Sequence, residues 1–136
     1  MKQFTFEVKT EGNTEILNLS KELTPKISEF EGPGLVHLFV VGSTAGITTL
    51  EYEPGLVKHD LPAFFQRIAP DDIRYQHEAT WHDDNGHAHV RSALIGPSLT
   101  IPFAKGKLLT GQWQQVVLVD FDTSPRKRQI VVTVMT

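Results

Sequence analysis

The segment Leu35–Val41 is nearly continuously apolar, and it constrains the fold more than any other part of the sequence. An apolar run of this length, bounded by Gly32-Pro33-Gly34 and by Gly42, predicts a strand at the centre of a sheet. Two β patterns precede it: apolar side chains alternate along Lys2–Val8, and the pattern returns in Glu15–Leu19. We therefore expect a fold organised around a sheet.

Three segments predict short helices. The first is amphipathic and begins after Ser20, its expected N-cap. The second is expected to have Asp60 as its N-cap and to stop at Pro70. Periodicity alone leaves Val90–Ile95 open between a helix and a strand, but the Gly-Pro pair that follows favours a helix from about Gly86 to Ile95.

β patterns dominate the rest of the chain. Ile73–Thr80 is expected to be extended. Further strands are expected at Ile47–Tyr52, Ser98–Pro102, Lys107–Thr110, Trp113–Phe121 and Gln129–Met135. Strands joined by tight turns, with a few short helices, predict an α+β fold: one compact domain over residues 1–136, with a largely antiparallel sheet and two to three short helices.

The composition argues against several function classes. No cysteine is present, which rules out disulfides, a thiolate nucleophile and a cysteine zinc site, so any metal would need His, Asp, Glu or water ligands. A net charge of −3 argues against a nucleic-acid partner, and the basic run Arg126-Lys127-Arg128 is expected to be a solvated turn. No apolar stretch reaches the ~20 residues of a membrane span, so we expect no membrane contact and a cytoplasmic protein.

Histidine is concentrated in one short stretch. Four of the six histidines lie within thirteen residues that also contain three carboxylates. These histidines are His77, His82, His87 and His89, and Asp83 lies among them. Imidazole is the commonest protein metal ligand and the only side chain whose unperturbed pKa lies near neutrality. The stretch therefore predicts a functional site.

The secondary structure of this stretch decides which imidazoles can share a ligand. His87 and His89 would point the same way on a strand, whereas on a helix they would diverge by about 200°. The spacing matches no metal motif such as HExxH. The alternative is a polar surface loop whose histidines form local hydrogen bonds.

Three other places contain candidate residues. Glu51 and Glu53 would share one face of an extended segment, either as metal or acid–base groups or as the solvent face of an edge strand. The segment Gly42–Gly46 offers backbone donors and two hydroxyls that fit a phosphate, or else it forms a plain turn. Trp113 and Gln114 fit a heterocycle by stacking and hydrogen bonding, or Trp113 belongs to the core.

Five stretches resemble the YjbQ-like family of small proteins, also called the secondary thiamine-phosphate synthase family. They are Leu35–Val40, Ser43–Thr48, Asp83–His89, Leu94–Pro102 and Leu108–Gln114, and Arg128–Val134 fits the closing strand. Together they cover nearly the whole chain in the family's order.

The resemblance implies a compact α+β fold that assembles as a trimer. Where an activity is assigned to the family, it is a weak thiamine-phosphate synthase activity, which joins a pyrimidine pyrophosphate to a thiazole phosphate with loss of pyrophosphate. By position, the family's polar residues correspond to Thr44, Glu51, His77, Asp83 and His89, with Trp113 and Gln114 nearby.

The chain departs from the family pattern at two positions. Gly42 stands where the family usually has a histidine, and Leu50 stands where it usually has an asparagine. Either the site is degraded, or His82 or His87 replaces the missing ligand.

Two functions are expected as alternatives. The first is a divalent-metal site, zinc by ligand type, with a phosphorylated small-molecule substrate and a possible thiamine-phosphate synthase activity. Its candidate residues are His77, His82, His87, His89 and Glu51 as metal ligands, Glu51, Asp83 and His89 as catalytic groups, and Thr44, Trp113 and Gln114 as substrate contacts. The second is a non-catalytic ligand-binding or assembly protein.

A homotrimer is expected from the strands near the chain end. Trp113–Phe121 and Gln129–Met135 are long and apolar, and in a monomer they would risk forming an exposed edge that promotes uncontrolled pairing. Closed symmetric assembly covers such strands, and the family resemblance implies three-fold symmetry. Ligands from neighbouring loops would then lie near a subunit boundary, so metal binding and assembly should be coupled.

Overall fold

The protein folds as two antiparallel sheets and a small set of helices, in a computed structural model that describes residues 1–136. The strands are β1 Lys2–Thr10, β2 Glu15–Asn18, β3 Gly34–Val40, β4 Ala45–Leu50, β5 Ser98–Ala104, β6 Lys107–Leu108, β7 Gln115–Asp120 and β8 Arg126–Met135. The helices are α1 Ser20–Ile27, α2 Leu61–Ile68, α3 Gln76–Trp81 and α4 Gly86–Ile95, and a π-helical segment, η1 Leu56–Asp60, precedes α2. The predicted α+β class is confirmed, with four α-helices instead of two to three.

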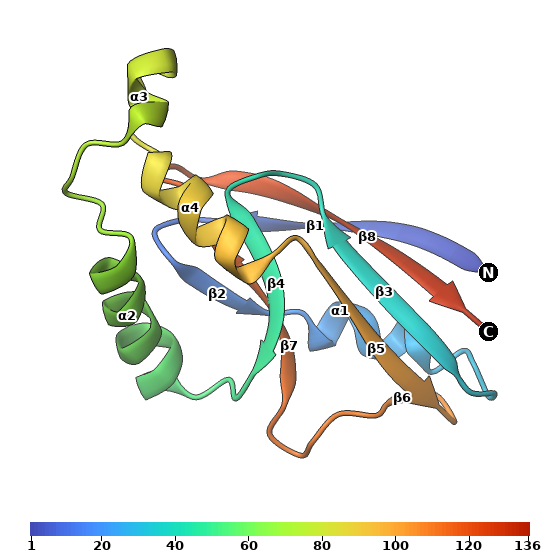
Figure 1. The fold of residues 1–136 in the computed structure, drawn as a ribbon. Helices are drawn as coiled ribbons and strands as arrows, with labels where there is room; N and C mark the ends of the chain where they lie inside the picture. Colours follow the sequence, from blue (N-terminus) through green and yellow to red (C-terminus); the bar gives the residue numbers. More distant parts are fainter.

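The strands form a large and a small sheet. The large sheet has the order β1-β8-β3-β5-β6, and the small sheet has the order β2-β7-β4. Every hydrogen-bonded pair is antiparallel. In Figure 1, α2, α3 and α4 lie on one side of the molecule, next to the small sheet, and the large sheet lies on the other. The chain thus forms three layers.

β3 occupies the centre of the large sheet, as its apolar sequence predicts. It pairs with β5 on one side and with β8 on the other. Leu38 lies opposite Leu99 on β5 and Val132 on β8, and it is fully buried. Side chains of both sheets and of α1 meet in the main hydrophobic core that surrounds it.

β7 connects the two cores of the molecule, because both of its faces are buried. Val116 and Leu118 point into the core between the sheets, and Val117 and Val119 point into a second core under the helices. Phe65 of α2 completes that second core. A strand buried on both faces reads as a continuous apolar run, which explains the pattern of Trp113–Phe121.

The prediction that Ile73–Thr80 is extended is wrong, because α3 occupies Gln76–Trp81. The helix starts with reciprocal hydrogen bonds: the backbone N–H of Tyr75 donates to the Glu78 carboxylate over 3.0 Å, and the Glu78 N–H donates to the Tyr75 carbonyl over 3.2 Å. Local capping thus fixes a helix too short to show an apolar period.

The predicted N-caps Asp60 and Ser20 form no capping hydrogen bond. Asp60 does stand at the N-cap position of α2, but its backbone is already helical because η1 runs directly into α2. The helical segment begins after Glu53, whose carboxylate accepts hydrogen bonds from the N–H groups of Gly55 and Leu56. Ser20 is the first residue of α1, and the Asn18 side chain accepts its N–H. The carboxylate of Glu53 is therefore a capping group.

The basic run Arg126-Lys127-Arg128 is not the solvated turn that its composition indicates. It forms the start of β8, paired with β1, and Arg128 is buried. A buried guanidinium requires a charged partner, and the partner comes from β7, as described below. No helix of the protein is long and apolar enough to cross a membrane.

The central position of β3 leads to a first prediction. Leu38→Ala should lower the free energy of unfolding by about 2–5 kcal/mol, because it leaves a cavity in the main core. Leu35→Ala, on the same strand but 45% exposed, is the matched control and should change it by less than about 1 kcal/mol. Urea unfolding of both variants measures the difference. Equal losses would contradict the assignment of β3 faces.

Candidate functional site

The histidine-rich stretch is divided between two helices and the turn that joins them. His77 lies on α3, and His87 and His89 lie on α4. His82 is the C-cap of α3, where its φ of 57° places the backbone in the left-handed region. Since the stretch is largely helical, its histidines point in different directions.

His77 and His89 form one pair of adjacent imidazoles. Their ring centroids are 4.3 Å apart, with an angle of 36° between the ring planes. Nδ1 of His77 lies 3.1 Å from the Oδ1 atom of Asp83, a hydrogen bond that orients the ring. His77 and Asp83 are partly exposed, at 27% and 36% of their side-chain surfaces, so solutes can reach the pair.

The environment favours the uncharged form of His89. Burial lowers the pKa of His89 from its ordinary 6.5, and the neighbouring His77 lowers it further. The carboxylates of Asp122 and Asp83 act in the opposite direction but do not cancel the effect. A neutral imidazole has one donor and one acceptor nitrogen, so His89 can bind a polar group or accept a proton.

His87 lies on the other side of α4, as the helical geometry requires. It is 4% exposed, and its Nδ1 atom is buried without a hydrogen-bond partner. Burial lowers the pKa of His87, and the charge of Arg91 lowers it further. His87 and His82 therefore do not join the His77–His89 pair within this chain.

Glu51, Trp113 and Gln114 form a second group at the opposite end of β4. They line a surface hollow of about 480 Å³. Gln114 Nε2 donates to the Thr49 hydroxyl over 2.9 Å, and Trp113 is 64% exposed, so Trp113 is not a core residue. Glu51 follows β4 and Thr44 precedes it, which separates the two groups by on the order of 20 Å.

Thr44 is buried between two charged residues. Its hydroxyl donates to Asp122 over 2.9 Å and accepts a hydrogen bond from Nη2 of Arg128 over 2.7 Å. Arg128 also binds both carboxylate oxygens of Asp120, at 2.6 and 2.9 Å. The sequence analysis gave Thr44 a substrate contact, whereas its hydroxyl is used within the chain.

The surroundings of Asp122 in this network favour its charged form. Burial alone would raise the pKa of Asp122, but hydrogen bonds from Thr44 and from the Thr123 backbone, together with the charge of Arg126, lower it overall. Thr10 donates a further hydrogen bond to Asp120, over 2.6 Å. We call this set the Arg128 network; its members are Thr10, Thr44, Asp120, Asp122, Arg126 and Arg128.

Sequence reasoning missed this network, although a signal for it exists. Asp120 and Asp122 alternate on one side of a turn, and Arg126 and Arg128 alternate on the other. Opposite charges at spacing i, i+2 on both sides of a short connection indicate ion pairs across it, and here the connection joins strands of two different sheets. The network also reaches the connection between α3 and α4, because Thr123, whose N–H donates to Asp122, donates its hydroxyl to Asp84 over 2.7 Å.

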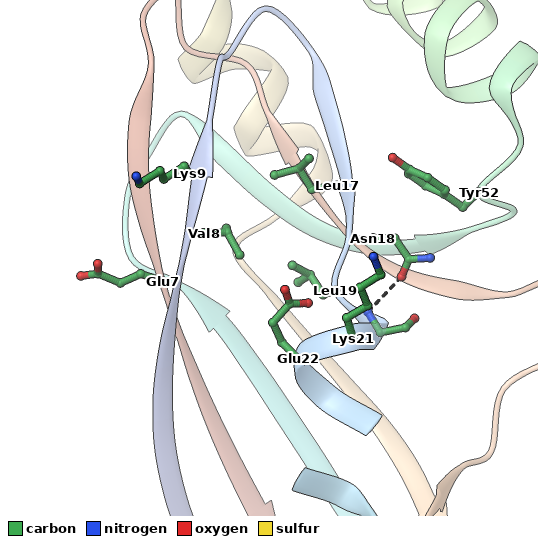
Figure 2. A pocket seen from close by; sticks show the side chains of 10 residues that line it. Glu7, Val8, Lys9, Leu17, Asn18, Leu19, Lys21, Glu22 and Tyr52 are labelled. Atoms are coloured by element: carbon green, nitrogen blue, oxygen red, sulfur yellow. Dashed lines mark hydrogen bonds between the residues drawn. The ribbon is translucent and has the colours of Figure 1, made fainter. Parts of the chain in front are cut away.

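A separate cavity of about 590 Å³ lies between β1 and the start of α1 (Figure 2). Val8, Leu17 and Leu19 give it apolar walls. The Oε2 atom of Glu22, which Figure 2 shows beside the cavity, is buried without a hydrogen-bond partner. None of the metal-ligand, catalytic or substrate-contact residues predicted from the sequence lies there.

The structure does not assemble the predicted metal ligands within one chain. No group of three or more His, Asp or Glu side chains is arranged so that it could hold a metal ion. Of the five predicted ligands, only His77 and His89 are adjacent. A metal ion at this pair therefore stays a prediction, and its remaining ligands would have to be groups other than the five predicted ones.

Comparison with known proteins identifies the family. Residues 4–136 match the family described as UPF0047 protein YjbQ-like. The chain belongs to this family. A UPF0047 protein of Methanocaldococcus jannaschii is 32% identical over 133 residues, 97% of this chain and 93% of that protein. The UPF0047 protein YjbQ of Escherichia coli O157:H7 is 32% identical over 136 residues, 97% of this chain and 94% of that protein.

Solved structures confirm the YjbQ-like fold. A hypothetical protein of Aeropyrum pernix K1 has a TM-score of 0.89 and 30% identity, over 99% of this chain and 98% of that chain. A YbjQ-like protein of unknown function from Sulfolobus solfataricus P2 has a TM-score of 0.86 and 26% identity, over 98% and 97% of the two chains. These names describe no activity, so the family assignment fixes the fold and leaves the function to the site.

The lowered pKa values of His87 and His89 predict an acid-sensitive fold. In the folded chain both imidazoles have a pKa below the ordinary value of 6.5, which they regain in the unfolded chain. Below about pH 6.5 the unfolded chain therefore binds more protons than the folded chain. Stability should therefore be complete above about pH 6.5 and fall as the pH drops towards the folded pKa values, by about 1.4 kcal/mol for each unit of difference.

Urea unfolding at about pH 7.5 and about pH 5.5 measures this dependence, with His87→Gln as the comparison because glutamine does not titrate. The variant should lose less stability on acidification than the parent chain. A parent chain that gains stability at the lower pH would contradict the assignment.

Proposed function

We propose that this protein is a non-catalytic binding protein for a small phosphorylated molecule. Its site is the surface formed by α3, the start of α4 and the loop Gly42-Ser43-Thr44. The observation that supports this most directly is the His77–His89 pair, in which two partly exposed imidazoles lie side by side and Asp83 orients one of them. Such a pair can exchange hydrogen bonds with the polar groups of a ligand.

The neighbouring loop supports the choice of a phosphorylated ligand. Gly42 and Ser43 are exposed, and the Ser43 backbone lies near the ring of His89. Backbone N–H groups and a hydroxyl beside imidazoles are the groups that bind phosphate in proteins without a P-loop. Phosphate binding at this surface therefore does not require Glu51, Trp113 or Gln114, which lie at the other end of β4.

A divalent cation at the same pair is a second proposal, and zinc fits the ligand type. It is favoured by the contact of Asp83 with Nδ1 of His77, because metal-bound histidines usually have their other ring nitrogen hydrogen-bonded to a carboxylate. Water, a phosphate of the ligand, or a second copy in the homotrimer that we propose would supply the remaining positions.

The thiamine-phosphate synthase reaction is a more specific proposal for the same protein. Both of its substrates are phosphorylated, and exposed Trp113 offers a stacking surface for a pyrimidine. Glu51 and Trp113 nevertheless lie at the opposite end of β4 from the histidines, so one chain places no complete set of reacting groups together. For this reason binding is the function that the geometry supports best.

A thermal-shift screen with isothermal titration of the hits tests the proposal. The panel contains phosphorylated metabolites with their dephosphorylated forms, and it includes the pyrimidine pyrophosphate and the thiazole phosphate. A ligand at 100 times its dissociation constant should stabilise the fold by about 2.7 kcal/mol. The His77→Ala/His89→Ala double variant should lose this stabilisation, and His82→Asn, which alters an exposed histidine outside the pair, should keep it.

Four outcomes change the proposal. Equal binding by the double variant and the parent would remove the imidazole pair from the site. Release of pyrophosphate from the two thiamine precursors would replace binding with transferase chemistry. Elemental analysis of tag-free protein purified without chelators, combined with light scattering, tests the cation and the trimer: metal content that does not fall in the double variant excludes the cation at this pair, and a mass of one chain excludes the trimer.

A further inference from the structure

Arg128 has hydrogen-bond donors that the protein does not use. Its side chain is only 7% exposed. The Nε and Nη2 atoms donate to Asp120, and Nη2 also donates to Thr44. The Nη1 atom donates to no protein acceptor, and it is not among the buried polar atoms that lack a partner, so its N–H groups face accessible space.

Gly42 leaves this edge of Arg128 uncovered. A Cβ atom at Gly42 would lie 2.8 Å from Nη1, closer than side-chain carbons approach other atoms. The φ of Gly42 is 144°, in the region that favours glycine, and the residue is exposed. Any side chain at this position would therefore stand between the guanidinium and the solvent.

The backbone of the same loop presents further free donors. The N–H groups of Gly42, Ser43 and Thr44 donate no hydrogen bond within the chain, either to the backbone or to a side chain. Consecutive free N–H groups form concave anion sites in many proteins, and a guanidinium beside them adds a charge-assisted donor. Val41, by contrast, donates to Gln129 and marks the end of the paired backbone.

The two buried carboxylates next to this loop are each paired with a guanidinium group. Asp120 is paired with Arg128, and Asp122 is paired with Arg126 at 3.0 Å. On the histidine side of the loop, Asp83 is hydrogen-bonded to His77 and has no Lys or Arg partner. The Arg128 side of the loop, where Nη1 is free, is therefore the side that favours an anion.

We propose that the Gly42-Ser43-Thr44 loop and Nη1 of Arg128 form an anion subsite that binds the phosphate group of a phosphate monoester. The identity of the ligand rests on the proposed function, whereas the subsite itself is defined by free donors and can be tested alone. The phosphate sits over Gly42, and the organic part of the ligand extends towards the His77–His89 pair. Arg128 then has two roles, as a buried partner of Asp120 and as a ligand contact.

Inorganic phosphate is the first probe. It is titrated into uniformly ¹⁵N-labelled protein at constant ionic strength, so that general screening does not change. The amide signals of Gly42, Ser43 and Thr44 and the side-chain N–H signals of Arg128 should move together along one saturable curve. Shifts that miss these groups, or that grow linearly without saturation, would overturn the proposal.

Gly42→Ala provides the second arm, because a methyl group there covers Nη1. Gly96→Ala is the matched control: Gly96 also has a positive φ, of 87°, and an added Cβ there meets no atom within 4 Å. Gly42→Ala should weaken phosphate binding by at least about tenfold, and Gly96→Ala should leave it within about twofold. Equal effects of the two variants would overturn the role of the Gly42 opening.

The His77→Ala/His89→Ala variant separates this inference from the proposed function. If the subsite is correct, the double variant still binds inorganic phosphate at the loop, even where it has lost a larger phosphorylated ligand. If the double variant binds the larger ligand normally, the proposed function fails while the subsite stands. If phosphate shifts no loop amide but phosphorylated metabolites still bind through the histidines, the subsite fails and the proposed function stands.

Discussion

The ion pair between Arg128 and Asp120 is the interaction on which the rest of the site depends. Both side chains are almost fully buried, and two hydrogen bonds of 2.6 and 2.9 Å join them. Burying two charges costs several kcal/mol for each ion, so such a pair adds little net stability, but removing one partner leaves a buried charge without compensation. The pair therefore fixes the arrangement of β7 and β8 more than it raises their stability.

The ion pair also determines where the loop before β4 lies. Thr44 contacts Arg128 and Asp122 at once, so its position follows from the two strand ends. The loop between β7 and β8 holds the connection between α3 and α4 through the hydrogen bond of Thr123 with Asp84. As a result, the loop and the His77–His89 pair lie on a support that is built from the end of β7 and the start of β8. Polar networks of this kind are rigid when every member has a partner.

Much of the fold could be predicted from local sequence. The central strand, the antiparallel terminal strands and the helix α4 over Gly86–Ile95 all follow from apolar period and from glycine and proline signals. The helical segment η1 before α2 and the six residues of α3 could not, because hydrogen bonds to the side chains of Glu53 and Glu78 fix where they begin and leave no periodic pattern. A helix as short as α3 contains too few residues for an apolar period to be detected.

The site was only partly predictable, since it depends on contacts between distant segments. The histidine stretch and Asp83 were found from composition, and a helical reading of Gly86–Ile95 already implies that His87 and His89 diverge. The separation of Glu51 from the histidines follows from the direction of β4, which no local pattern shows. Arg128 was assigned to a solvated turn because its partner, Asp120, lies on another strand.

The most direct test of the central role of the ion pair is the response of the distant histidines to Asp120→Asn. This substitution keeps the shape of the side chain and removes the charge that balances Arg128, which should cost about 3–5 kcal/mol of unfolding free energy. The ring signals of His77 and His89 in a proton–nitrogen spectrum of the folded variant should shift, although residue 120 contacts neither ring. A loss below about 1 kcal/mol together with unchanged histidine signals would contradict the account.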